Sequence, residues 1–271
     1  FLGAFTFFKG DGGEHEGGDY VSLVRLNGVI MAGADFSAFN VLPILEDAFS
    51  DKKAKGVILE INSGGGSPVQ ASIIESKILE LKKKYNKKVV VVGEDLLASG
   101  AYLVAMGGDT IYVNNDTITG SIGVIMEGFG FVGAMDKLGV TRRVYTAGAN
   151  KDQLDSFLPV TEKDKAKVAT ILDQAHDNFI DIVTASRGEK ITGDDDVVFS
   201  GDFWVGKTAL TLGLVDGIGN TSQVMSDEFD VDKYVDYSKQ PSIIDVIFKG
   251  AKSELNKSFS FEQQGHLSAK F

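Results

Sequence analysis

The sequence lacks several residue types on which common functional sites depend. It contains no cysteine, which excludes disulfide bonds, thiolate metal sites and a cysteine nucleophile. Its 4 prolines against 32 glycines indicate tight turns and close backbone approaches rather than proline-rich linkers. The apolar segment at the start, Phe1–Phe8, is far shorter than the ~20 residues that a helix needs to span a bilayer.

Positive charge is also in deficit. The 27 Lys and Arg residues stand against 38 Asp and Glu residues, for a net charge of -11. A nucleic-acid-binding protein would normally present a basic face, so this balance argues against that class. The remaining composition, 43% hydrophobic and 24% charged, is ordinary for a globular protein and allows a sizeable core.

The chain divides by pattern into three parts. Residues 1–19 join the apolar start to an acidic, glycine-rich linker, residues 20–248 carry regular patterns, and residues 249–271 form a polar tail. The apolar start is either the remnant of a membrane anchor or a terminus that packs locally, and its residues alone do not decide between the two. We expect the middle part to be the functional domain.

Strand and helix patterns alternate along the middle part. The helix over 68–85 has Ser67 as a candidate N-cap, Pro68 at its first position and three lysines in its last turn. A short helical segment precedes a strand expected at 142–146. Alternation with short connections predicts an α/β layered fold with a largely parallel sheet and flanking helices. The other expected strands are 20–30, 56–61, 88–93 and 110–113, and the other expected helices are 36–49 and 161–187.

A glycine-rich turn, Asn62–Gly66, follows one expected strand and precedes the helix over 68–85. Backbone amides near a helix N-terminus can hold a negative charge, such as a phosphate or the oxyanion of acyl transfer. The turn lacks the Gly-Lys-Ser/Thr ending of a P-loop and the full dinucleotide spacing. It predicts either an anion-holding turn or a structural connection.

Ser99 lies between Ala98 and Gly100, just after another expected strand and before an apolar run. A serine at such a place is either a helix N-cap or a nucleophile on a strand-to-helix turn. Small neighbours leave its hydroxyl uncovered, and the Gly100 amide could donate to an oxyanion. Both interpretations stay open on this segment alone.

A serine nucleophile needs a base. His15 lies in the linker and His266 in the tail, both poorly placed for a rigid site, and His176 lies within the long helix, where a structural role is the simpler interpretation. Lys151, in a loop of small residues, is another candidate. It could accept a proton only if burial lowered its pKa from about 10.4.

Five segments together resemble the signal peptide peptidase A (protease IV) family. They are Asn62–Gly66, Ala98–Tyr102, Thr119–Val124, Gly148–Asp152 and Gly201–Gly219, in the order and approximate spacing of that family. The resemblance extends from residue 20 to residue 219. It implies a crotonase/Clp-protease-like fold and a serine protease with a Ser-Lys dyad, without cofactor or metal.

The resemblance also assigns roles to particular residues. Ser99 is implied to be the nucleophile and Lys151 the general base. The amides of Gly100 and of Gly66 or Gly65 are implied to form the oxyanion hole.

The chain departs from the family pattern at two positions. Gly64 stands where the family usually has proline, and Ala101 stands at the second glycine of its Ser-Gly-Gly motif. Neither change removes a chemical group from the implied site. The first removes a rigidifying proline from the turn.

The family further implies partners and a location. These are peptide substrates such as cleaved signal peptides, a homo-oligomer with sites shared between subunits, and an N-terminal membrane anchor. The anchor would hold the catalytic domain on the extracytoplasmic, periplasmic side of a bacterial-type inner membrane. A crotonase-type acyl-CoA enzyme or a catalytically silent scaffold of the same fold are the alternatives.

Overall fold

The computed structural model describes residues 19–238, so the expected anchor remnant, most of the linker and the polar tail lie outside it. Within this range the chain forms a mixed sheet of eight strands. The strands are β1 (Tyr20–Asn27), β2 (Ala54–Ser63), β3 (Lys88–Ala98), β4 (Thr110–Val113), β5 (Ile118–Gly120), β6 (Phe203–Val205), β7 (Gly217–Ile218) and β8 (Tyr234–Asp236).

The sheet is parallel except at β6, which runs antiparallel to β5. The main order is β6-β5-β3-β2-β1-β8, and β4 pairs with both β3 and β7. On the side away from β2, β3 pairs first with β4 and then, through Leu96–Ala98, with β5. The expectation of a largely parallel α/β fold is confirmed, and the end of β3 lies between two other strand ends.

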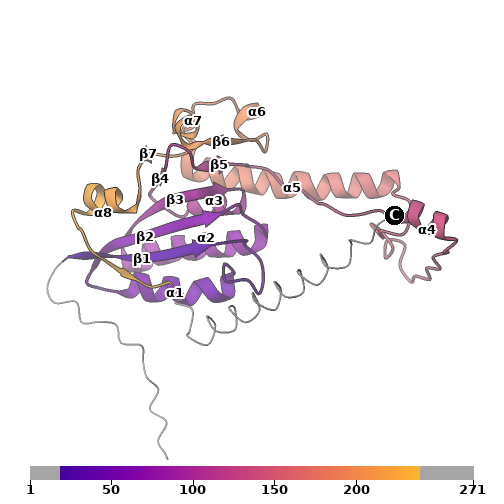
Figure 1. Ribbon diagram of the computed structural model, residues 1–271, viewed down its shortest axis with the longest axis horizontal. Helices are drawn as coiled ribbons and strands as arrows, with labels where there is room; N and C mark the ends of the chain where they lie inside the picture. The colour runs from indigo at the N-terminus through magenta and orange to yellow at the C-terminus, as the bar shows by residue number, and fades with distance from the viewer. Residues whose placement is uncertain (1–18, 239–271) are drawn as a thin grey trace, which may run out of the picture. The chain divides into compact units, whose positions relative to one another are not determined.

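Helices cover both faces of this sheet (Figure 1). Residues such as Leu59 and Val91 on one face pack against α1, α2 and α3, whereas Ile58 and Val90 on the other face pack against α8. This alternation follows from the two-residue period of a strand. The helices are α1 (Ala38–Ser50), α2 (Pro68–Tyr85), α3 (Gly100–Ala105), α4 (Val132–Leu138), α5 (Glu162–Arg187), α6 (Asp195–Val198), α7 (Gly206–Thr211) and α8 (Thr221–Phe229).

Helix α5 extends beyond the sheet, and α4 lies at its far end (Figure 1). The helix begins at a capping box, in which Thr161 and Asp164 exchange hydrogen bonds with each other's backbone. Of the helices in residues 19–238, none is both long and apolar enough to cross a membrane.

Local sequence signals placed most elements correctly. Helix α2 has the expected bounds, and the Ser67 side chain accepts a hydrogen bond from the Gln70 N–H as the expected cap. Strands β2 and β3 are longer than expected. The extension of β3 matters most, because the strand runs through Ala98 and ends directly at Ser99.

The strand expected at 142–146 is wrong. These residues form no regular structure and, apart from Val144, are exposed. Val144 and Tyr145 favour a strand locally, but no strand of the described chain lies beside them to supply hydrogen bonds. Arg142 instead forms an ion pair with Asp155, with Nη2 and Oδ2 2.7 Å apart.

Asp51 joins the first and last described strands to the turn after α1. Its Oδ2 accepts hydrogen bonds from the hydroxyls of Tyr20 and Tyr237, both at 2.8 Å. Burial alone would raise the pKa of Asp51, but the Lys53 N–H and the two tyrosines outweigh burial and hold this pKa below its ordinary value. The stabilisation is therefore present above the unfolded pKa of about 3.9 and is lost as the pH falls through the folded value.

Replacing Asp51 by alanine is expected to lower the free energy of unfolding by about 2 kcal/mol at neutral pH, because two tyrosine hydroxyls lose their acceptor. Urea unfolding followed by circular dichroism measures this loss. Asp47→Ala, an exposed aspartate on α1, is the control and should unfold like the parent protein. Equal stability of the two variants would contradict the role of Asp51.

Candidate active site

Ser99 occupies a strained turn between β3 and α3. Its φ is 54° and its ψ is -126°, a combination that residues other than glycine rarely adopt. Such a conformation costs about 1–3 kcal/mol and persists only where surrounding bonds enforce it. Here the Ser99 N–H donates to the Gly120 carbonyl at 2.8 Å, and the Ser99 carbonyl accepts from the Leu103 N–H at 3.0 Å.

The Ser99 hydroxyl does not cap the helix that it precedes. Ser99 stands at the N-cap position of α3, but its side chain makes no capping hydrogen bond. The side chain is half-buried rather than enclosed. A partly accessible serine on a strained strand-to-helix turn is the arrangement that presents a hydroxyl for chemistry, so of the two sequence interpretations the geometry favours the nucleophile.

The Asn62–Gly66 turn packs directly against the peptide that joins Ser99 to Gly100. A Cβ added to Gly65, whose φ is 94°, would lie 2.6 Å from the Gly100 nitrogen and 2.8 Å from the Ser99 Cβ. A Cβ added to Gly66, whose φ is 146°, would lie 2.2 Å from the carbonyl oxygen of Ile30. Both positions therefore require glycine, for conformation and for space.

Two backbone amides, those of Gly100 and Gly66, lie beside Ser99. Two hydrogen bonds join Ile30 to this turn: the Ile30 N–H donates to the Gly65 carbonyl at 2.9 Å, and the Ser67 N–H donates to the Ile30 carbonyl at 2.7 Å. The Gly66 N–H, between them in the chain, takes part in neither bond. The Gly65 N–H donates to the Ser63 Oγ at 3.1 Å. A Cβ added to Gly100 would lie 3.3 Å from the Gly66 nitrogen, so the amides of Gly100 and Gly66 are close. Between Gly65 and Gly66, the geometry favours Gly66 as the donor.

Strand β5 and the residue that follows it support the nucleophile turn. Gly120 supplies the carbonyl that holds the Ser99 N–H, and the ring of Trp204 lies so close that a Cβ on Gly120 would be 2.7 Å from it. Thr119 donates from its hydroxyl to the Leu97 carbonyl at 2.7 Å, and the Ser121 N–H donates to the Asp202 carbonyl at 2.7 Å. Four of the five sequence motifs therefore meet around Ser99, and only Gly148–Asp152 lies apart.

The side chain of Asn62 fixes an irregularity in β3, and sequence reasoning missed this role. Between Ile61 and Ser63 the register with β3 shifts, so that residues 94–96 bulge. Asn62 accepts from the Leu96 N–H at 3.1 Å and donates to Asp95 at 3.2 Å. An asparagine at a strand end before a glycine run is a turn signal that could have pointed to this contact.

Lys151 is not brought to Ser99 within one chain. It is exposed and lies in the segment between α4 and α5, which Figure 1 shows at the end of α5 away from α3. Among the described residues, no hydrogen bond joins the two side chains. His176 is half-buried, and its Nε2 lies 3.0 Å from the Ile122 carbonyl oxygen rather than near the Ser99 hydroxyl. His15 and His266 lie outside the described residues.

Comparison with known proteins agrees with this arrangement. Residues 81–233, more than half of the chain, match the model of "Peptidase family S49". The match begins within α2 and includes Ser99, Lys151 and the segment after β5. The chain belongs to peptidase family S49, and the resemblance inferred from the five motifs is confirmed.

Relatives differ in name and in length. The chain is 44% identical over 205 residues to a Brucella melitensis protein named "Na(+)/H(+) antiporter NhaA", covering 74% of the chain and 28% of that protein. It is 31% identical over 220 residues to the "Putative signal peptide peptidase SppA" of Enterococcus faecium, covering 78% of the chain and 63% of that protein. It is 30% identical over 213 residues to "Protease 4" of Haemophilus influenzae, covering 76% of the chain and 34% of that protein. The chain thus spans less than two thirds of each of these relatives.

Proposed function

We propose that this chain is the catalytic part of a serine endopeptidase with a Ser-Lys dyad. The observation that carries the proposal is the strained Ser99, whose hydroxyl makes no hydrogen bond to residues 19–238 and lies beside the amides of Gly100 and Gly66. A nucleophile with two neighbouring N–H groups to receive an oxyanion is the arrangement that acyl transfer requires. Because the chain belongs to a peptidase family, the bond that Ser99 would attack is a peptide bond.

The reaction follows from these groups. Neutral Lys151 accepts the proton of the Ser99 Oγ while that oxygen attacks the peptide carbonyl carbon. The Gly100 and Gly66 amides donate to the resulting oxyanion, a stabilisation worth about 3 kcal/mol for one donor. The lysine then protonates the leaving amine, which departs with the C-terminal product. Neutral Lys151 next takes a proton from water, the hydroxide attacks the acyl carbon and breaks its bond to Ser99 Oγ, and Lys151 returns the proton to that oxygen.

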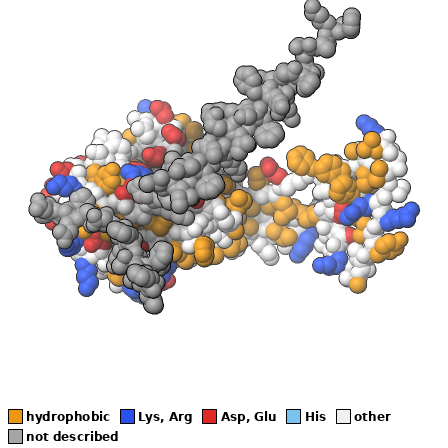
Figure 2. Space-filling view, turned by 60° about the horizontal axis from the view of Figure 1, so that its bottom comes forward, with side chains coloured by type: hydrophobic (Ala, Val, Ile, Leu, Met, Phe, Trp, Pro, Cys, Tyr) orange, Lys and Arg blue, Asp and Glu red, His pale blue; other side chains and the backbone are white. Residues whose placement is uncertain are grey.

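We propose that the base comes from a neighbouring subunit. In one chain Lys151 is exposed, and a general base at neutral pH needs a lysine pKa lowered by burial. The segment that carries Lys151 also exposes large apolar side chains, the pattern expected of an interaction surface. Figure 2 shows such side chains, with basic ones, at the α4 end of the protein. The exposed apolar side chains before, within and after α4 include Ile125, Met126, Phe129, Leu138, Val140 and Tyr145.

The substrates proposed are hydrophobic peptides such as cleaved signal peptides. Exposed apolar side chains surround the turn that adjoins Ser99: Val29 and Met31 flank Ile30, Val69 follows the turn, and Leu96 touches it. Extended apolar peptides would cover them. The printed name of the Enterococcus faecium relative supports the same substrate class.

We further propose an extracytoplasmic site of action, on the periplasmic side of a bacterial-type inner membrane. Support comes from the apolar composition of Phe1–Phe8 and from the printed name of the Enterococcus faecium relative, because cleaved signal peptides arise at a membrane. The antiporter name belongs to the Brucella protein, most of which lies outside the matched region, and is not carried over to this chain.

Covalent labelling tests the proposal. The assembled protein is treated with an apolar peptidyl phosphonate, and the modified residue is located by mass spectrometry. We expect one adduct, on Ser99, that disappears in Lys151→Ala and persists in Lys137→Ala, an exposed lysine of α4. Cleavage of peptides without an adduct on Ser99 would contradict the nucleophile. A thermal shift with acyl-CoA, without cleavage and without an adduct, would favour the crotonase-type alternative. The absence of cleavage, adduct and thermal shift would favour a scaffold.

A further inference from the structure

Helix α5 is long and is held at one end. Its 26 residues extend about 39 Å at ~1.5 Å per residue. Three of its four buried residues, Phe179, Val183 and Arg187, lie in its last nine positions, and the fourth, Asp164, belongs to its own capping box. The direction of α5 therefore depends on contacts in its C-terminal half, which also include the His176 Nε2 at 3.0 Å from the Ile122 carbonyl oxygen.

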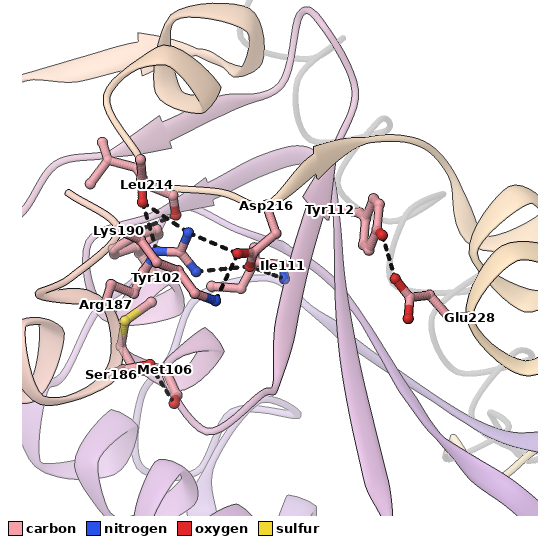
Figure 3. Close-up of polar contacts among 11 residues, drawn as sticks. Tyr102, Met106, Ile111, Tyr112, Ser186, Arg187, Lys190, Leu214, Asp216 and Glu228 are labelled. Atoms are coloured by element: carbon pink, nitrogen blue, oxygen red, sulfur yellow. Dashed lines mark hydrogen bonds and ion pairs between the residues drawn. The ribbon is translucent and has the colours of Figure 1, made fainter. Parts of the chain in front are cut away.

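Arg187 is the most extensively bonded of these residues. Its side chain is only 2% exposed, and its Nη1 and Nη2 lie 2.9 and 3.3 Å from the two carboxylate oxygens of Asp216. Its Nε and Nη2 also donate to the Gly213 carbonyl at 3.0 and 2.8 Å (Figure 3). A planar guanidinium held at two acceptors fixes both the position and the rotation of the helix end.

Asp216 connects this contact to the sheet. Its Oδ2 accepts from the Ile111 N–H of β4 at 2.8 Å, and its own N–H donates to the Ile111 carbonyl at 2.7 Å. Lys190 adds an exposed ion pair at 2.8 Å. Burial would raise the pKa of Asp216, but hydrogen bonds from Arg187 and Lys190 outweigh it and lower the pKa.

The same turn also holds the helix that follows the nucleophile. Tyr102, three residues after Ser99, is fully buried and donates its hydroxyl to the Leu214 carbonyl at 2.6 Å (Figure 3). Residues 213–216 therefore bind α3, which begins beside Ser99, and α5, which continues from the segment with Lys151. This turn is one connection between the two parts of the proposed dyad, beside the hydrogen bond that Ser186 on α5 donates to the Met106 carbonyl at the end of α3, at 3.2 Å.

We propose that Arg187 is a positioning residue, which sets the direction of α5 and thereby the place at which Lys151 reaches its Ser99 partner. The inference rests on the proposed function, because only a base carried by this segment makes the direction of α5 matter for catalysis. Arg187 itself touches no reacting atom.

The length of α5 makes the anchor sensitive. A rotation of about 10° at its C-terminal end moves its first turn by about 7 Å, given its length of about 39 Å. A misplacement of about 1 Å between reacting groups can lower a rate by about 10²-fold. In the proposed assembly, contacts with a neighbouring subunit would limit the rotation, but they would not restore a direction that Arg187 no longer specifies.

Distance measurement tests the anchor without relying on activity. Because the chain has no cysteine, spin labels can be placed at Lys167→Cys on α5 and Lys83→Cys on α2, both exposed. Labelled subunits are diluted with unlabelled ones so that only distances within a subunit contribute. We expect Arg187→Met to shift or broaden the distance distribution by several Å, while Lys190→Met, which removes only the exposed partner of Asp216, leaves it unchanged.

Kinetics test the consequence for catalysis. Arg187→Met is expected to lower kcat by about 10²-fold with little change in KM, because peptide binding beside Ser99 is retained. Arg187→Lys keeps the charge but not the planar guanidinium, and its kcat should fall less than that of Arg187→Met. This variant takes the place of Arg187→Met if the methionine variant does not fold. An unchanged distance distribution would overturn the anchoring role. A shifted distribution with unchanged kcat would overturn the positioning role, whereas full turnover by Ser99→Ala would refute the proposed function and leave the distance result standing.

Discussion

Two inactive variants, Ser99→Ala and Lys151→Ala, are expected to regain peptidase activity when their subunits assemble together. Each substitution alone should lower kcat by at least about 10⁴-fold, because either the nucleophile or its base is missing. If each site takes Ser99 from one subunit and Lys151 from the next around a ring, random assembly completes roughly a quarter of the sites. Co-expression with two affinity tags, sequential purification and a peptide-cleavage assay measure the recovery.

The control for this experiment is a mixture of Ser99→Ala with the double variant, which cannot complete any site and should stay inactive. Separately prepared variants mixed without reassembly give the background. Recovery near a quarter of parental activity would identify a site shared between subunits. A co-assembled mixture that stays inactive, beside an active parent protein, would show that both groups come from the same chain.

Gly65→Ala is expected to lower kcat by about 10²–10³-fold, the loss associated with one oxyanion donor. The new methyl group would lie 2.6 Å from the Gly100 nitrogen and 2.8 Å from the Ser99 Cβ, so the turn must move away from the nucleophile. The residue also has a φ of 94°, which an alanine adopts only with strain. Steady-state kinetics and thermal unfolding together separate the catalytic loss from the smaller loss of stability.

Gly64→Ala is the matched control for that substitution. It lies one residue earlier in the same turn, its φ is not in the left-handed region, and an added Cβ would be 3.9 Å from Leu96, an ordinary contact. We expect unchanged kcat and a stability that is unchanged or higher by less than about 1 kcal/mol. Equal losses of kcat at both positions would show that the turn tolerates no side chain for reasons unrelated to the oxyanion.

The sequence predicted those elements whose signals are local. Helix α2 has the expected bounds because Ser67, Pro68 and the lysines of its last turn act within one or two helical turns. The parallel sheet followed from alternating strand and helix patterns. The cluster of Ser99 with Gly65, Gly66 and Gly100 was expected from ordered motifs, and the structure places these residues together.

What the sequence could not predict depends on contacts between distant segments. The conformation of Ser99 is enforced by the hydrogen bond from its N–H to the Gly120 carbonyl, and residues 94–109 alone do not predict that bond. Residues 142–146 have the composition of a strand but no neighbour to pair with. The separation of Lys151 from Ser99 follows from the direction of α5, which depends on the contact between Arg187 and Asp216.

The packing of Trp204 against Gly120 has a spectroscopic consequence. Trp204 is the only tryptophan in the chain, and the carbonyl of the glycine beneath its ring holds the Ser99 N–H. The intrinsic tryptophan emission of the unlabelled protein therefore originates at the wall of the candidate active site. Every event that moves the nucleophile turn acts on this one chromophore, so the protein carries its own optical reporter.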